Sequence, residues 1–131
     1  MAAAAPTVTT VKTNQRDNRL NFGNNYPVWE YVLTALWDAD DTADATFTLD
    51  INGILQKVIL DVPDTTDAVT GQVAIADNGS NTIFDSGEKA EAVTYSYNVS
   101  EPLCGTTTVT VGISAAPGAS TATVVVTLRG I

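Results

Sequence analysis

A chain of 131 residues is long enough to form one domain with a single hydrophobic core. Its net charge of −9 argues against nucleic acid or an anionic membrane as a partner, because phosphate groups are bound by clustered Lys and Arg. The chain has no histidine and one cysteine, which excludes histidine bases, histidine-ligated metals and an internal disulfide.

The charge divides the chain into a polar, mildly basic arm, residues 1–25, and an acidic remainder, residues 26–131. Three bases and one acid give the side chains of the arm a charge of +2, whereas three bases and fourteen acids give the remainder −11. We expect residues 7–12, TVTTVK, to form a short strand and residues 13–25 to be extended. The sequence therefore predicts a single β domain preceded by an arm.

The arm is the part of the chain that we expect to bind a partner. A basic polar segment attached to an acidic domain suits docking onto an acidic partner or a neighbouring copy, and it becomes ordered only along a large contact surface. A terminus without any role is the alternative. The candidate partner-binding residues are the bases and apolar anchors of the arm, namely Arg16, Arg19, Leu20 and Phe22.

Residues 28–37, VWEYVLTALW, fit either a helix with one apolar stripe or a strand with its aromatic residues on one face. We predict a strand, because aromatic and β-branched residues dominate and a helix would end in acids that oppose its dipole. We expect Trp29, Tyr31 and Trp37 to lie in the core, since each can bury a large apolar area. A sugar-stacking platform, as in carbohydrate-binding modules, is the alternative.

Residues 45–62 give the strongest local signal. Two alternating runs are joined by Asn52-Gly53, a dipeptide that readily takes the positive φ angles of a type I′ turn. We therefore predict a hairpin with one strongly apolar face. Its predicted cross-strand pairs are Ile51 with Ile54, Phe47 with Val58, and Ala45 with Leu60.

The same alternation continues to the end of the chain. Further strands are predicted at 68–76, 82–84, 92–99, 106–113 and 121–128. We expect the last two to form a hairpin-like pair in the centre of a sheet. Closely spaced strands with turns between them predict an all-β fold, an antiparallel β-sandwich or barrel of about eight strands, Ig-like or jelly-roll-like, with an extended N-terminal arm.

The sequence offers few residues for chemistry. No motif specifies a nucleophile or a phosphate loop, so we expect neither enzymatic activity nor a cofactor. The candidate metal ligands are the densest acidic cluster, Asp38, Asp40, Asp41 and Asp44, but the cluster lacks the Gly and Glu of an EF-hand loop and reads more simply as a solvated turn. We expect Cys104 to be a small buried apolar residue, with a reactive thiol or an intermolecular bridge as the alternative.

Taken together, these features resemble the capsid decoration (cement) proteins of tailed phages. The likeness covers the style of the whole chain: a β domain rich in Ala, Thr and Val, an early polar arm, one cysteine, the Asn52-Gly53 hairpin, and the strands TTTVTVGI and TATVVVTLRGI. It implies a non-enzymatic virion protein that binds the outer shell at symmetry axes, often as a trimer, and clamps neighbouring capsid subunits. It also implies that the arm contacts the shell while the acidic body faces solvent.

The partner expected from this resemblance is the major capsid protein or another virion protein, together with further copies of the chain. The start of the sequence lacks the basic and apolar regions of a secretion signal, so we expect synthesis in the host cytoplasm and a final location on the capsid surface. Two other classes stay open. One is an extracellular β-sandwich adhesin or carbohydrate-binding module, and the other is a different virion part such as a tail-tube or head-fibre subunit.

Overall fold

The computed structural model describes residues 6–15, 28–65, 67–118 and 121–131. Their regular structure consists of β-strands, which confirms the predicted all-β class. The strands are β1 (Thr7–Gln15), β2 (Val28–Trp37), β3 (Ala45–Val62), β4 (Gly71–Ala76), β5 (Thr82–Asp85), β6 (Val93–Ile113) and β7 (Ala122–Gly130). They form one hydrogen-bonded, seven-stranded sheet in the order β1-β2-β7-β3-β6-β4-β5. The described part of the chain contains no helix that could span a membrane.

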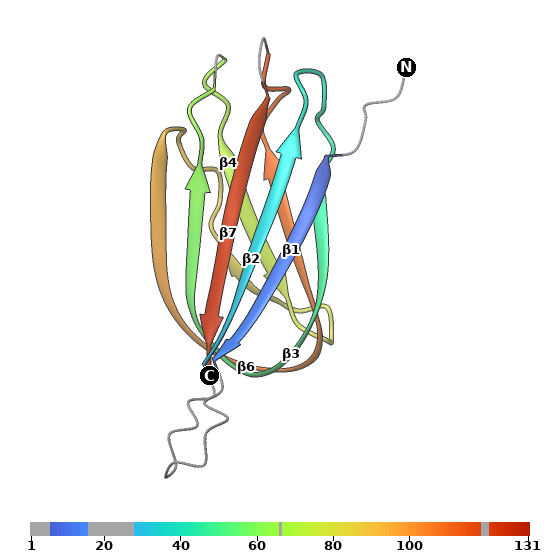
Figure 1. Ribbon diagram of the computed structural model, residues 1–131, viewed down its shortest axis with the longest axis vertical. Coiled ribbons are helices and arrows are strands. Elements are labelled where there is room, and N and C mark those ends of the chain that lie inside the picture. The colour runs from blue at the N-terminus through green and yellow to red at the C-terminus, as the bar shows by residue number, and fades with distance from the viewer. Residues whose placement is uncertain (1–5, 16–27, 66, 119–120) are drawn as a thin grey trace.

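The sheet folds over on itself into two layers, because β3 and β6 bend together at one end of the molecule (Figure 1). The first half of β3 pairs with the second half of β6, and β4 and β5 extend this back layer. The second half of β3 pairs with the first half of β6 on one side and with β7 on the other, and β2 and β1 extend this front layer. The result is a sandwich-like fold in which two long strands belong to both layers.

The predicted hairpin at Asn52-Gly53 is wrong, because both residues lie inside β3. They pair with Cys104 and Leu103 of β6 instead of forming a turn. Each half of the segment finds more partners this way, since β6 pairs along nearly all of β3 and β7 adds a second neighbour. The pairs expected for the hairpin, such as Phe47 with Val58, therefore do not form.

Gly53 has a different role from the one expected. Its φ of 155° is one that L side chains rarely adopt, and a Cβ at this position would collide with the carbonyl oxygen of Ile131. That approach is part of a backbone pairing, in which the Ile54 amide donates to the Ile131 carbonyl at 2.7 Å and the Ile131 amide donates back at 3.0 Å. A glycine within a strand here marks the close passage of another segment of backbone.

A second continuous strand, β6, explains the other differences in the number and order of the strands. The strands predicted at 92–99 and 106–113 are the two halves of β6, so seven strands replace about eight. β7 lies in the interior of the sheet as expected, but it pairs with β2 and β3 and not with β6. The second half of β6 already has β3 and β4 on its two sides, so the final strand crosses to the front layer.

The core confirms the strand predicted at 28–37. Alternate side chains of β2 are buried, including Trp29, Tyr31 and Trp37, so the alternative of a sugar-stacking platform built from these three aromatics is wrong. Trp37 is fully buried and its indole Nε1 donates to the Ala43 carbonyl at 2.7 Å. Trp29 and Tyr31 meet edge to face with their ring centroids 6.0 Å apart.

The buried positions of β3 change from odd-numbered to even-numbered residues along the strand. Phe47, Leu49 and Ile51 are buried in its first half, whereas Val58 and Leu60 are buried in its second half. An irregularity in the register between Leu55 and Lys57 shifts the alternation by one residue. This shift keeps both halves facing the space between the layers after the bend.

Candidate functional site

The surface that stands out in this fold is the outer edge of β1. Among the described strands β2 alone pairs with β1, from Thr7 opposite Leu36 to Gln15 opposite Val28. The side chains of residues 7–13 are all exposed, and Val8 and Val11 are exposed by 46% and 52%. This strand therefore offers a row of backbone amide and carbonyl groups together with apolar side chains.

Both faces of β1 carry exposed side chains. Lys12 is the cross-strand neighbour of the buried Tyr31 and points to the same side of the sheet, whereas Val11 lies beside Val32 on the other side. β3 of the back layer comes close to β1, and Tyr31 donates its hydroxyl hydrogen to the Asp50 carbonyl of β3 at 3.1 Å. The side chains of residues 7–13 nevertheless remain exposed on both faces.

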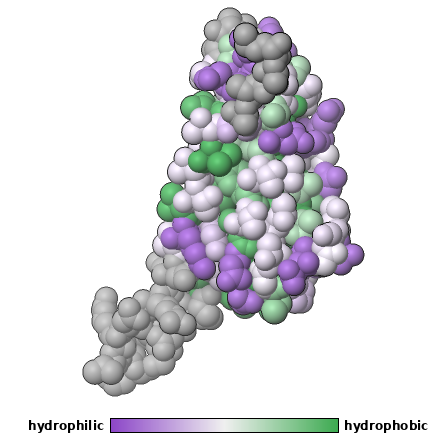
Figure 2. Space-filling model, turned by 90° about the vertical axis from the view of Figure 1, so that its right-hand side faces the viewer, coloured by the Kyte–Doolittle hydropathy of each residue, from purple (hydrophilic) through white to green (hydrophobic). Residues whose placement is uncertain are grey.

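The side of the molecule that carries β1 is weakly charged in its middle. Figure 2 shows pale and hydrophobic surface there, with most of the hydrophilic side chains toward the margins. Lys12 is the one charged residue of β1, and its Nζ lies 5.3 Å from the centre of the Tyr31 ring on the neighbouring strand. The cation–π contact holds this charge over the protein's own sheet and away from the open edge.

Two other sheet edges, β5 and the first half of β6, carry devices that natural proteins use against unwanted strand pairing. β5 has four residues, is irregularly paired with β4 and ends in Asp85. The first half of β6 leads into Glu101 and Pro102, a charge and a residue that cannot donate a backbone hydrogen bond. β1 has nine residues in uninterrupted register without Pro, so it is the least protected of these edges.

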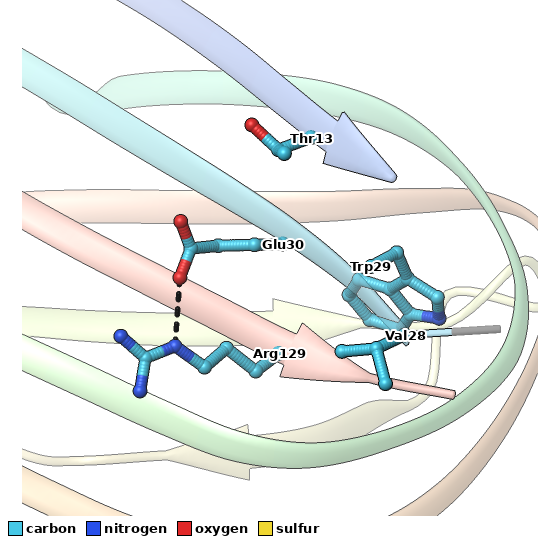
Figure 3. Close-up of a pocket in the computed structure, with 5 residues that line it drawn as sticks. All are labelled: Thr13, Val28, Trp29, Glu30 and Arg129. Carbon is cyan, nitrogen blue, oxygen red and sulfur yellow. Dashed lines mark hydrogen bonds and ion pairs between the residues drawn. The ribbon is translucent and has the colours of Figure 1, made fainter. Parts of the chain in front are cut away.

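A shallow hollow of about 280 Å³ adjoins one end of this edge, lined by Thr13, Val28, Trp29, Glu30 and Arg129 (Figure 3). Arg129 Nε donates to Glu30 Oε2 at 2.7 Å, and the two residues are direct cross-strand neighbours. Because their charges compensate each other, the hollow presents a neutral polar wall beside the apolar side chains of Val28 and Trp29. We regard it as an extension of the β1 surface.

Two of the four aspartates considered as metal ligands, Asp38 and Asp41, hydrogen-bond with each other. Asp41 is buried, its carboxylate accepts the Asp38 amide hydrogen at 2.9 Å, and its own amide donates to the Asp38 carbonyl at 3.0 Å. This exchange fixes the turn between β2 and β3, whereas Asp40 and Asp44 are not buried with it. Within the described ranges, no three acidic or cysteine side chains are grouped to hold a metal ion.

Two other carboxylates hold loops in place. Asp77 accepts the amide hydrogens of Gly79 and Asn81, both at 2.9 Å, and the hydrogen bonds from Asn81 are the main reason that its pKa lies below the usual value. Glu91 accepts the amide hydrogen of Thr65 at 2.7 Å and its hydroxyl hydrogen at 2.9 Å, which lowers the pKa of Glu91 as well. Both shifts come from structural hydrogen bonds within the domain.

The structure locates only part of the predicted arm. Residues 7–15 of the arm form β1, which is longer than the strand predicted at 7–12. The candidate partner-binding residues Arg16, Arg19, Leu20 and Phe22 lie outside the described residues. The signal that could have indicated the β1 edge is the composition of TVTTVKTNQ, which contains neither Pro nor acid, but it does not say which strand ends at an edge.

Cys104 is exposed, which corrects the prediction of a buried residue. It lies at the bend of β6 opposite Asn52, and its neighbour Leu103 is the residue that turns into the core. Alternation along a strand sends adjacent side chains to opposite faces, so burial of Leu103 places Cys104 outside.

No protein-family model matches the sequence, and no curated protein matches it either. A solved chain from Bacillus endospore appendages, described as a novel family of disulfide-linked pili, is 16% identical with a TM-score of 0.48, over 99% of this chain and 93% of that chain. A chain of infectious bursal disease virus, Gx strain, is 10% identical with a TM-score of 0.43, over 98% of this chain and 33% of that chain.

A third similar structure is the enzymatically active domain of tailspike protein 4 from bacteriophage CBA120. It is 17% identical with a TM-score of 0.38, and the match covers 96% of this chain and 18% of that chain. This chain thus spans a third of the virus chain and less than a fifth of the tailspike chain. All three TM-scores are below 0.5, so a function has to be inferred from the surfaces of this chain itself.

Proposed function

We propose that this protein is a non-enzymatic structural subunit that decorates or cements the outside of a tailed-phage capsid. The observation that carries the proposal is the open edge of β1, a nine-residue strand that ends the described sheet and whose residues 7–13 are exposed. Long and regular sheet edges are templates for strand addition, and proteins that do not use them cover or charge them. The one charge of β1, Lys12, lies over the Tyr31 ring. An edge left in this state indicates a protein that works by contact with other chains.

The basic residues that follow β1 are the proposed contact to the shell. Arg16 and Arg19 stand directly after a strand that carries no acid, in a chain whose net charge is −9. A basic segment on an acidic body suits an acidic shell surface, and Leu20 and Phe22 would supply apolar contact. The major capsid protein is the proposed partner, and the virion surface is the proposed location.

The test starts from the gene that neighbours the gene of this chain. If that gene encodes a major capsid protein, capsids are assembled from it, mixed with the purified full-length protein, and sedimented. We expect the protein to sediment with the capsids, and the double substitution Arg16→Glu, Arg19→Glu to weaken binding at least tenfold. Lys57→Glu with Lys89→Glu is the matched control, because it changes the net charge equally on the β domain and should leave binding unchanged.

Substitution is preferable to deletion of the arm. Removing residues 1–25 would also remove β1, which is paired with β2 along its whole length, and would make β2 an edge strand. Lost binding would then not distinguish a missing contact from a damaged sheet. Failure of the unsubstituted protein to bind capsids, or an equal loss in both double variants, would refute the proposed function.

A further inference from the structure

The residues of β1 suit antiparallel pairing with the β1 strand of a second copy. Two identical strands that pair in antiparallel fashion over their full length bring the middle residue of each onto the two-fold axis. The middle residue of the nine in β1 is Val11, which at 52% is the most exposed large apolar side chain of the described residues. Pairing by symmetry would therefore bury the apolar side chain that the single chain leaves most open.

The polar residues of β1 agree with the same register. With Val11 opposite Val11, Lys12 of each copy lies opposite Thr10 of the other, and Thr7 lies opposite Gln15. No two like charges face each other across the pair, which is a requirement for stable strand pairing. Lys12 is already drawn over Tyr31, so it does not block the approach of a second strand.

We propose that the β1 edge is a self-association surface, at which a second copy of this chain adds its own β1 in antiparallel register about Val11. The front layers of the two copies then form one continuous sheet. A full-length pairing supplies about eight to ten backbone hydrogen bonds. On the outer face Val11 and Val32 are cross-strand neighbours, so the two copies together form an uninterrupted row of four valines.

Charge favours a second copy at this edge over the other edges of the same molecule. Both copies carry a net charge of −9, so they repel wherever their acidic surfaces meet. β1 contains no acid, whereas β5 ends in Asp85, the first half of β6 leads to Glu101 and the first half of β3 contains Asp50. Two β1 edges are thus the approach at which two acidic domains repel each other least.

This inference deepens the proposed function by naming the occupant of one contact surface, but it is tested without a capsid. The purified full-length protein is examined by sedimentation equilibrium over a wide range of concentrations. We expect a reversible monomer–dimer equilibrium, with a dimer of twice 13.7 kDa. Val11→Lys would place two charges directly opposite each other at the axis, so the dissociation constant of the dimer should rise at least tenfold.

The matched control for this substitution is Val93→Lys. Val93 is exposed by 44% on the first half of β6, at the opposite edge of the same layer, so the control adds the same charge at similar exposure. It should leave the dissociation constant unchanged. Circular dichroism and urea unfolding check that both variants remain folded.

The register is tested separately by oxidative cross-linking. In a Cys104→Ser background, Val11→Cys places two thiols opposite each other at a separation that suits a disulfide, about 4.5–5.5 Å between Cα atoms. Thr7→Cys is the control, because the two thiols introduced at position 7 would lie about 27 Å apart along the paired strands. We expect rapid dimer cross-linking only with cysteine at position 11.

A protein that stays monomeric at the highest concentration would overturn the inference. So would a dimer that Val93→Lys disrupts and Val11→Lys does not, or one that cross-links through position 7 and not position 11. These outcomes are independent of the capsid test. A dimer that does not bind capsids refutes the proposed function alone, and a monomer that binds capsids refutes the self-association alone.

Discussion

Replacement of Gly53 by alanine tests the continuous β3 strand directly. The substitution forces an L side chain into a φ of 155°, which costs about 1–2 kcal/mol. The new Cβ also collides with the Ile131 carbonyl, so the two hydrogen bonds between Ile54 and Ile131 should be lost at about 1 kcal/mol each. We expect Gly53→Ala to lower the free energy of unfolding by about 3–4 kcal/mol.

A second change separates these contributions. A chain that ends at Gly130 lacks the same two hydrogen bonds and should lose about 2 kcal/mol by itself. In the doubly changed protein those bonds can be lost only once, so the total should fall short of the sum of the single effects by about 2 kcal/mol. Urea unfolding monitored by tryptophan fluorescence measures all four proteins, and Trp29 lies beside the site.

The hairpin suggested by Asn52-Gly53 makes a different prediction for the same four proteins. A turn glycine would be strained by alanine, but it would have no contact with Ile131. The two costs would then add within about 0.5 kcal/mol, as they do for independent sites. Additive costs would therefore refute the close passage of these two backbone segments and the strand order that depends on it.

Two further predictions concern the domain itself. Trp37→Phe should lower the free energy of unfolding in urea by about 1–2 kcal/mol more than Trp29→Phe, because it leaves the Ala43 carbonyl without its hydrogen-bond donor. The Trp29 indole nitrogen has no hydrogen-bond partner among the described residues, so Trp29→Phe loses no such bond. Equal losses for the two variants would contradict this prediction. The hydrogen bonds with Thr65 lower the pKa of Glu91 in the folded protein. The Glu91 carboxylate therefore stabilises the fold above pH 4.5, the ordinary pKa of this group, and this stabilisation is lost as the pH falls through the lower pKa of the folded state. The urea midpoint of Glu91→Gln should accordingly fall less between pH 6 and pH 3 than that of the unsubstituted protein, and parallel curves would show that this carboxylate does not stabilise the loop.

The sequence predicts best those elements whose structure depends on neighbouring residues alone. In β2 aromatic and β-branched residues dominate, which favours a strand, and burial of every second side chain follows once the segment is a strand. Gly53 is different, because one glycine signal fits both a turn and a close backbone approach. The choice between them depends on β6, on β7 and on Ile131, which are remote in the sequence.

The candidate site was predictable only in part for a related reason. The pattern of residues 7–12 indicates a strand, but it would look the same in the middle of a sheet as at its edge. The open edge of β1 results from the order of strands, which a local pattern does not encode. The exposed Cys104 likewise depends on how β6 bends opposite Asn52.

The two strands shared between the layers have a mechanical consequence. A tensile load applied to the front layer passes through the covalent backbone of β3 and β6 into the back layer, and it does not rely on side-chain packing between the layers. The layers cannot slide past each other as independent plates at this end, since the backbones of β3 and β6 and the hydrogen bonds between them cross the bend. A covalent connection between the layers is thus built into the path of the chain.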